Sequence, residues 1–443
     1  MRLSLTKLIF IGLALILPVS TAYGKTISLD EAIKIALENN PAIKEAEAQL
    51  KQTVGDLEAA RSGLLPKLKF ESSYIRINEE KAIPVFAGPD PQHLQKVLSI
   101  PIALEDTFSL SVKLEWLIWG GGKVQAMVKA LEHAVKAKEA SLMATKNDVI
   151  HETKRAFYAT LKAKAYMELM EDMVKLLEAH QDRVKKLYER GVVPKSDLLR
   201  IGVELSNTKL AYLKAQNAFK LAKASFKTTL GLRDVEIEPE DVKAKPEINI
   251  SELSQYLEVA KSNRPELLAI RRALDQAESY IKASTASLKP NYILSAKYGK
   301  TDSSFIPEKE EWNIALAIQW NLYDGGEAKG NIDKAKGIRD ELLAKLRKVE
   351  DGISLGVENA YLNLRSALER LGVAERELES AQLDYEMTVK RYNAQVASIT
   401  DVLDAQTALK EARTHLIDAI YDIWISWSDL RYHCGYEVMK NER

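Results

Sequence analysis

Two stretches of the chain alternate strictly between apolar and polar residues. Every second residue of 108–118 is apolar, and serine, lysine and glutamate occupy the positions between them up to Glu115. Residues 312–322 repeat the alternation. A period of two places one apolar and one polar face on a β-strand. Each stretch follows a weaker apolar run, at 68–77 and 292–298, so the sequence predicts one strand hairpin in each half of the chain.

The apolar strand faces suit two environments. A half-buried sheet of a soluble protein would alternate in the same way. Trp312 and Trp320, however, stand eight positions apart (320 − 312 = 8), which is roughly 20 Å of height for a strand tilted by about 40°. Outer-membrane barrels have an apolar band of about 25 Å between two aromatic girdles. We therefore predict that the strands face lipid with Phe108, Leu110, Trp116, Trp312, Leu316 and Trp320.

A long heptad pattern follows each hairpin. Residues 123–190 contain neither glycine nor proline, which permits one helix of roughly 100 Å at about 1.5 Å per residue. Apolar and small residues recur every seven positions over 149–184 and again over 353–381. Sustained seven-residue spacing predicts left-handed coiled-coil packing. Leu169 and Met173 lie off this row, so we expect the helix to pack against two neighbours.

The second half of the chain repeats the first. Tyr188 and Tyr392 stand 204 positions apart (392 − 188 = 204), and so do Asp197 and Asp401. A duplication of this size makes each half one structural unit. The expected organisation is a signal peptide at 1–22, repeat one at 23–230, a linker at 231–250, repeat two at 251–435 and a C-terminal tail at 436–443. Repeat one is expected to contain a strand hairpin at 68–118 and a helical tip at 188–198. Repeat two is expected to contain a strand hairpin at 291–323 and a helical tip at 392–402.

Residues 1–22 have the three parts of a secretory signal, with Arg2 and Lys7 as a positive start, an apolar core and a small-residue cleavage site. No other uninterrupted apolar stretch reaches the roughly 20 residues of a spanning helix, so we expect no transmembrane helix in the mature chain. The formal charge is zero, from 63 basic and 63 acidic residues, which disfavours nucleic acid as a partner. Cys434 is the only cysteine, so no disulfide can form within one copy.

Motifs for catalysis and metal binding are poor. His151-Glu152 is followed by Arg155 where a zinc protease has its second histidine. The segment 120–123 lacks the first glycine and the Ser/Thr of a phosphate loop, and it reads better as a flexible turn from strand to helix. The six histidines include no pair at metal-ligand spacing. We therefore expect no enzyme activity, no metal site and no cofactor.

Four strands cannot span a membrane alone. Each open edge of about ten residues would leave several unpaired backbone groups in hydrocarbon, at several kcal/mol per group. That penalty exceeds the roughly 5–15 kcal/mol by which whole domains are stable. We therefore expect strands from other copies to close a barrel.

The signal sequence, the duplicated strand and helical hairpins, the Trp-Gly-Gly-type strand exits and the reversal Tyr188-x-x-Gly191-x-x-x-x-x-Asp197 followed by leucine resemble the TolC family of outer-membrane efflux proteins. The resemblance covers about 27–435. It implies a mainly α protein with membrane β structure, in which each tandem-repeat protomer contributes four strands to a trimeric 12-stranded β-barrel. This barrel would continue into a long periplasmic α-helical coiled-coil barrel.

The same resemblance implies a passive exit duct in the outer membrane, serving a tripartite efflux pump or a type I secretion system. Its partners would be two further copies of the chain, a periplasmic adaptor and an inner-membrane transporter of the RND or ABC type. Outer-membrane lipid would surround the barrel. The cargo, whether small drugs, metal ions or polypeptides, stays open.

The resemblance also places a gate at the periplasmic tips. Asp401 and Asp404 match paired acids that ring the closed entrance, and Asp197 and Tyr392 would belong to the same constriction. Rings of acid bind or select cations. Alternatively, Asp401 serves only as a favourable charge on the helix dipole. Ala397 stands where a basic residue can latch the closed state, so the latch network stays open.

Lys195 or Arg200 of the first repeat can take the place of that basic residue. The adaptor would dock at the helical tips, through Tyr188, Gly191, Val192, Gln395 and Val396. A rival class is a periplasmic coiled-coil adaptor or scaffold whose strands form a small soluble domain. Such a scaffold would not be expected to carry two strand hairpins of membrane height with tryptophans at both ends.

Overall fold

The computed structural model describes residues 25–87, 91, 95–233, 235–242 and 248–436. The expected signal peptide at 1–22 therefore lies outside the described residues, as does the expected tail apart from Tyr436. Two compact units make up the described chain. We call residues 25–39, 152–242 and 371–421 the tip unit, and residues 40–151, 248–370 and 422–436 the sheet unit.

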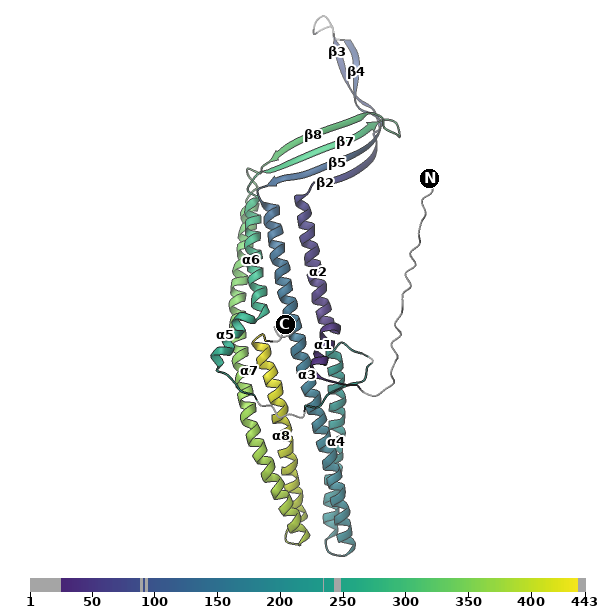
Figure 1. Cartoon of the computed structure of the whole chain (residues 1–443). Helices are drawn as coiled ribbons and strands as arrows, with labels where there is room; N and C mark the ends of the chain where they lie inside the picture. Colours follow the sequence, from purple (N-terminus) through teal and green to yellow (C-terminus); the bar gives the residue numbers. More distant parts are fainter. Residues whose placement is uncertain (1–24, 88–90, 92–94, 234, 243–247, 437–443) are drawn as a thin grey trace, which may run out of the picture. The chain divides into compact units, whose positions relative to one another are not determined.

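Helices predominate, and each half of the chain contains the same order of helices and main strands (Figure 1). In chain order the elements are β1 (Lys25–Ile27), α1 (Leu29–Asn39), α2 (Pro41–Arg61), the short 3-10 helix η1 (Ser62–Leu64), β2 (Lys67–Arg76), β3 (Lys81–Ala87), β4 (Gln95–Ala103), β5 (Asp106–Gly120), α3 (Lys123–Glu189), α4 (Lys195–Thr229), β6 (Ile237–Pro239), α5 (Leu253–Asn263), α6 (Pro265–Ala286), β7 (Asn291–Asp302), β8 (Glu310–Gln319), α7 (Glu327–Asn393) and α8 (Ile399–His433).

The duplication predicted from the sequence is visible in the helix lengths. The long helices α3 and α7 each contain 67 residues. The helices that follow them, α4 and α8, each contain 35 residues. Two 11-residue helices, α1 and α5, precede the strands in their respective halves. Within the described residues no helix is both long and apolar enough to cross a membrane.

In the tip unit, two helical hairpins pack through the predicted heptad rows. Leu177 and Val184 of α3 are fully buried in one cluster with Ile201 of α4 and Ile399 of α8. Farther along α3, Met173 is buried in a second cluster that also includes residues of α4 and α8. The expectation that the long helix packs against two neighbours is therefore confirmed.

In the sheet unit, four antiparallel strands form one sheet in the order β2-β5-β7-β8. Each half supplies a neighbouring pair of strands. The helix before each pair begins with proline, and Asn40 caps α2 by accepting a hydrogen bond from the N–H of Ala42 at 2.9 Å. Asparagine before an N-terminal proline satisfies a free helix N–H and presets the first helical φ angle.

Two sequence-based expectations were wrong in detail. From its prolines, Pro84, Pro89, Pro91 and Pro101, the sequence predicts a loop over about 78–106 between β2 and β5, but β3 and β4 pair there as an antiparallel hairpin. After the first reversal, the cap-forming residues Ser196 and Asp197 predict a helix start at one of them, but α4 already begins at Lys195 and Pro194 precedes it without a side-chain cap. Proline suits that position because its fixed φ is compatible with a helix start.

Candidate functional site

The four-stranded sheet has one apolar and one polar face. Its register aligns apolar residues across neighbouring strands: Val112 of β5 lies opposite Phe70 of β2 and Tyr298 of β7, and Tyr298 lies opposite Trp312 of β8. Trp312 is 73% exposed and Leu316 is 65% exposed. A band of large apolar side chains with this exposure in one copy requires an apolar environment.

The predicted lipid-facing residues divide by strand. On β8 and directly after it, Trp312, Leu316 and Trp320 are strongly exposed. On β5, Leu110 and Trp116 are less exposed, and Phe108 is half-buried because its ring stacks on Tyr74.

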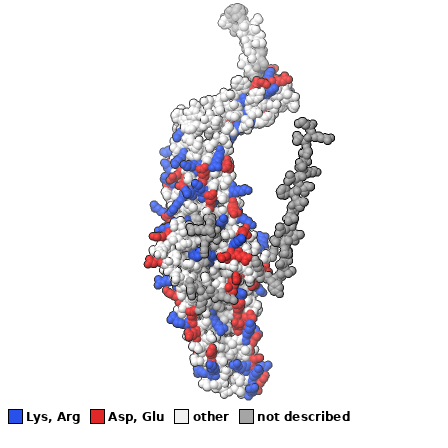
Figure 2. Space-filling model, viewed as in Figure 1, with Lys and Arg blue, Asp and Glu red and all other residues white. Residues whose placement is uncertain are grey.

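The opposite face of the sheet contains paired charges. Lys69 contacts Glu115 at 3.3 Å, and Lys113 pairs with Glu71. These pairs join β2 to β5. On the side of the molecule drawn in Figure 2, the sheet carries few charged side chains between its two ends, whereas the helices carry many. The sheet therefore separates an apolar surface from a polar one, as membrane barrels do.

Two equivalent tryptophans connect the strands to the preceding helices. The indole N–H of Trp116 donates to the carbonyl of Leu64 at 3.0 Å, and that of Trp320 donates to the carbonyl of Leu288 at 3.0 Å. An amphipathic indole with its N–H bonded is typical of a membrane–water boundary. These residues mark the helix-side end of the apolar band, and Trp312 lies near the other end.

The outer edges of β2 and β8 are unpaired within the described part of the chain. Each of these strands contains ten residues. Two open edges beside an apolar face cannot remain in hydrocarbon, because their backbone groups would lack hydrogen-bond partners. One copy therefore does not close a barrel by itself, and its two edges need strands from other copies.

The helical tips reverse through the same backbone motif in both repeats. In the first, Gly191 adopts φ +72° and the N–H of Val192 bonds to the carbonyl of Leu187 at 2.9 Å. In the second, Gln395 adopts φ +62° and the N–H of Val396 bonds to the carbonyl of Arg391 at 2.9 Å. Both are Schellman caps. The residues predicted for adaptor docking therefore form the two turns, with Tyr188 39% exposed one turn earlier.

Three polar contacts connect the two helical hairpins within one copy, and two of them lie at the tips. The hydroxyl of Tyr392 donates to Asp197 Oδ2 at 3.5 Å, so the structure brings together two of the predicted gate residues. Burial and the Asp197 carboxylate raise the pKa of Tyr392 to about 12. Arg200 Nη1 donates to Thr400 Oγ1 at 3.2 Å, which gives this basic residue a contact with the second tip.

Sequence reasoning missed the third of these contacts. His180 Nε2 lies 2.6 Å from the Tyr385 hydroxyl, between α3 and α7. Desolvation lowers the pKa of His180, which favours its neutral form beside the tyrosine. Tyr385 belongs to the heptad row, but nothing in the local sequence pairs it with a histidine of the other repeat.

The predicted acids of α8 occupy different environments from Asp197. Asp401 accepts the N–H of Ser398 at 2.8 Å, and the Ser398 hydroxyl accepts the N–H of Asp401 at 3.2 Å. This reciprocal pair is a capping box, and its hydrogen bonds lower the pKa of Asp401. Asp404 is exposed three residues later, on the same side of the helix. Asp401 therefore caps the helix, and both carboxylates are accessible in one copy.

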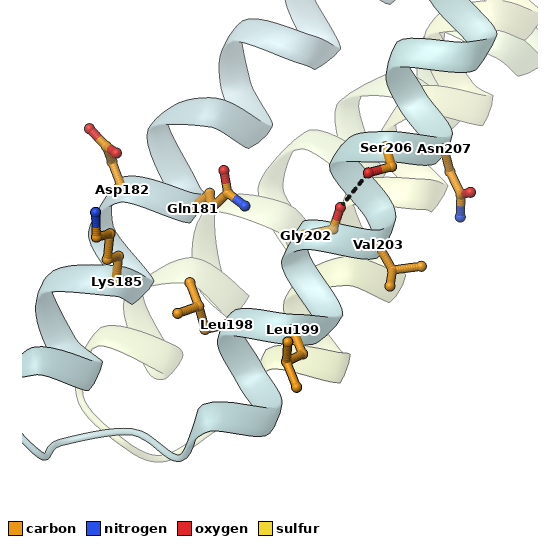
Figure 3. A pocket seen from close by; sticks show the side chains of 9 residues that line it. All are labelled: Gln181, Asp182, Lys185, Leu198, Leu199, Gly202, Val203, Ser206 and Asn207. Carbon is orange, nitrogen blue, oxygen red and sulfur yellow. Dashed lines mark hydrogen bonds between the residues drawn. The ribbon is translucent and has the colours of Figure 1, made fainter.

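A groove lies beside the first tip, between α3 and α4 (Figure 3). Its volume is about 750 Å³. Leu199 and Val203 of α4 line it and are 61% and 62% exposed. Asp182 and Lys185 of α3 form its charged side. Exposed apolar side chains beside polar and charged ones suit a partner helix that has an apolar face.

These features define a class of protein: a repeat protomer that contributes four strands to a membrane sheet and has two long helical hairpins with contacting tips. The sequence profile of the family described as "Outer membrane efflux protein" matches residues 32–232 and 256–435. The chain belongs to this family, in agreement with the resemblance noted from the sequence. The two matched segments correspond to the two repeats.

Individual relatives agree with this assignment. The chain is 21% identical over 416 residues to the outer membrane protein TolC of Vibrio cholerae, covering 92% of this chain and 90% of the relative. It is 22% identical over 394 residues to protein CyaE of Bordetella pertussis, covering 87% of this chain and 79% of the relative. The solved CmeC outer membrane channel of Campylobacter jejuni shares its fold with a TM-score of 0.78 at 19% identity, covering 92% of this chain and 85% of that chain.

Membership locates the chain in the outer membrane, with a large periplasmic portion. It also identifies the working assembly as a homotrimer that partners a periplasmic adaptor and an inner-membrane transporter. The rival assignment to a soluble scaffold is thereby excluded.

Proposed function

We propose that the chain forms the passive exit duct of a tripartite efflux pump or a type I secretion system. The observation that carries this proposal is the four-stranded sheet, with its exposed apolar face and two unpaired edges. In a homotrimer, β8 of one copy pairs with β2 of the next, and twelve strands close one barrel. The heptad-packed helices continue the duct through the periplasm.

The energy for transport comes from the partner in the inner membrane, of the RND or ABC type. The chain itself performs no chemistry in this scheme: it binds lipid, copies of itself and the adaptor. Passage therefore depends on the width of the duct and on the charges at its entrance.

The first test is the detergent-corrected mass of the purified mature protein, measured by light scattering. Three copies per particle agree with the twelve-stranded barrel, because one copy leaves two open edges. A stable monomer in detergent would overturn the proposal. Conductance in a planar lipid bilayer then tests whether the trimer forms a continuous duct.

The gate of this duct lies at the helical tips. Three copies would bring together six exposed carboxylates from Asp401 and Asp404, and these repel one another when ionised. The contacts between Tyr392 and Asp197 and between Arg200 and Thr400 hold the tips of each copy together against this repulsion. Arg200 thus supplies the basic side chain that latches the closed tips, which Ala397 cannot provide.

Replacing Tyr392 with phenylalanine tests the gate. The variant keeps the ring in its buried cluster but removes the hydrogen bond to Asp197, so we expect a larger fraction of time in the open state in single-channel recordings. Tyr188→Phe is the matched control, because it lies at the equivalent position of the first repeat and the described residues offer its hydroxyl no hydrogen-bond partner. Equal open probabilities for the two variants would remove Tyr392 from the gate.

The acids are tested separately. Asp401→Asn with Asp404→Asn should lower the preference for cations and weaken block by multivalent cations, because the entrance loses six negative charges in the trimer. The side-chain oxygen of asparagine can still accept the N–H of Ser398, so α8 should keep its start. Unchanged selectivity would place these acids away from the pore.

The groove beside the first tip is the proposed contact for a helix of the adaptor. Leu199→Glu and Val203→Glu should abolish binding of the adaptor while leaving the trimer intact, because both side chains are exposed in the groove. Retained adaptor binding would move the contact to another face of the tips.

A further inference from the structure

The insertion between β2 and β5 is a separate two-stranded hairpin in the sheet unit. The register pairs Ile83 with Ile100 and Val85 with Leu98. Figure 1 shows the hairpin projecting from the end of the sheet where β2 ends and β5 begins. In the second repeat, β7 and β8 are joined at the same end without any further strand. Each copy therefore carries one such hairpin, on the first repeat only.

One face of this hairpin is aliphatic and exposed. Residues at alternate positions of a strand share a face, so Ile83 and Val85 lie on the same side as their partners Ile100 and Leu98. The exposed fractions of these side chains range from 36% for Val85 to 58% for Leu98. An isolated two-stranded hairpin is at best marginally stable in water. An aliphatic face of this kind therefore indicates a partner surface.

A charged cluster separates the hairpin from the lipid-facing band of the sheet. Arg76 contacts Glu105 at 2.8 Å and Asp106 at 3.6 Å, and the Tyr74 hydroxyl donates to Asp106 at 2.7 Å. Arg76 is the last residue of β2 and Asp106 the first of β5, and Figure 2 shows charged side chains gathered at the base of the hairpin. Ionised groups in hydrocarbon are expensive, so the acyl region ends below this cluster. The hairpin lies beyond it, and lipid chains do not cover its aliphatic face.

The available partner is the same hairpin of the other copies. β3 follows directly after β2, whose free edge is the contact between copies in the proposed trimer. The hairpin therefore stands next to that interface, and a threefold axis repeats it three times around one opening. Identical aliphatic faces can bury one another around such an axis, since a symmetric contact requires only a self-complementary patch.

We infer that the three β3–β4 hairpins of a trimer pack against each other through Ile83, Val85, Leu98 and Ile100, and cap the outer mouth of the duct. This inference rests on the proposed trimer. The cap would be a second constriction in addition to the helical tips, and it would be held by apolar contacts instead of hydrogen bonds.

Single cysteines in the hairpin test the contact. Cys434, the only native cysteine, is fully buried, so the unaltered protein provides a silent background for thiol chemistry. Ile83→Cys places a thiol on the aliphatic face, and Pro84→Cys places one on the opposite face of the same strand. Both variants are made in the full-length protein, purified as trimers in detergent, and treated with a short bismaleimide or with a water-soluble maleimide.

If the hairpins pack together, Ile83→Cys cross-links between copies, and it reacts with the water-soluble maleimide roughly tenfold or more slowly than Pro84→Cys, as expected for a contact that must open before it reacts. Equal labelling of both thiols would overturn the inference, because the aliphatic face would then be in water. Slow labelling without cross-linking would also overturn it, because another molecule would cover the face.

A second measurement separates this inference from the proposed function. Ile83→Asn with Leu98→Asn should leave the mass of the trimer unchanged and raise its conductance in a planar bilayer, because the apolar contact across the mouth is lost. A trimer with unchanged conductance would refute the cap but not the duct. A monomer already in the unaltered protein would refute the duct and the cap together.

Discussion

The exit from strand to helix offers a matched pair of substitutions. Gly121 and Gly325 occupy equivalent positions in the two repeats and have nearly the same backbone angle, φ +65° and φ +67°. Their surroundings differ. A Cβ on Gly121 would lie 2.7 Å from the carbonyl oxygen of Ala286 and 2.7 Å from Cβ of Lys289, whereas a Cβ on Gly325 would have no atom within 4 Å.

The two alanine variants should therefore differ in stability. Both place an L-residue in the left-handed region, which costs about 1–2 kcal/mol. Only Gly121→Ala also creates overlap with backbone and with a side-chain atom that cannot rotate away, and overpacking of this kind costs about 1–3 kcal/mol. We expect Gly325→Ala to be destabilised by about 1–2 kcal/mol and Gly121→Ala by roughly 2–5 kcal/mol per copy.

Thermal unfolding of the purified protein in detergent, followed by helical circular dichroism, measures the difference. Gly121→Ala should unfold at a clearly lower temperature than Gly325→Ala, and both should unfold below the unaltered protein. If the two variants unfold at the same temperature, the close approach of α6 to the strand exit does not occur, and the sheet unit is packed differently from our description.

Three further predictions concern buried and charged residues of the helices. Ala367 is completely buried in the heptad row, so Ala367→Leu should lower the unfolding temperature through a cost of about 1–3 kcal/mol; an unchanged temperature would place this row at the surface. The pKa of Asp401 is lowered by hydrogen bonds from Ser398. The ionised Asp401 therefore stabilises the second tip above the ordinary aspartate pKa, and this stabilisation is lost as the pH falls through the lowered value. Amide exchange at the second tip should accelerate in that pH range in the unaltered protein but not in Asp401→Asn. The pKa of His415 is raised by Glu377, which lies 3.0 Å away. The pair therefore stabilises the folded protein at low pH, and this stabilisation is lost as the pH rises through the raised value. His415→Gln should remove that step from the pH dependence of the unfolding temperature.

The helical part of the fold was predictable because its signals are long. The heptad rows continue over many turns, and the absence of glycine and proline between Gly122 and Gly191 leaves one long helix as the simplest structure. The strands were predictable from strict alternation, and the register confirms that the alternating residues share faces.

The β3–β4 hairpin was missed because proline was read as a loop signal. Pro84 and Pro101 both lie within its strands. Proline lacks an N–H, but a two-stranded hairpin has edges where no N–H is needed. The apolar alternation of Ile83 and Val85 was the signal that could have identified the first strand.

The positions of the proposed gate residues were predictable from the sequence, but their contacts were not. The repeat placed Tyr392 and Asp197 at the two tips, and the structure joins them by a hydrogen bond. The capping box of Asp401 follows from short-range spacing, whereas the contact of His180 with Tyr385 joins residues 205 positions apart. Long-range polar pairs of this kind depend on how the helices rotate against each other, which the heptad pattern specifies only approximately.

The duplication has produced two tips of unequal strain. The first turn uses Gly191 in the left-handed conformation, where glycine has no steric penalty, while the second uses Gln395 in the same conformation, at a cost of about 1–2 kcal/mol. A strained turn persists only where its surroundings hold it. Here the surroundings include the hydrogen bonds from Tyr392 and Arg200 that cross between the hairpins. Breaking those bonds would release backbone strain in the second tip and none in the first. Strain relief therefore favours movement of the α7–α8 hairpin over movement of the α3–α4 hairpin when the proposed gate opens.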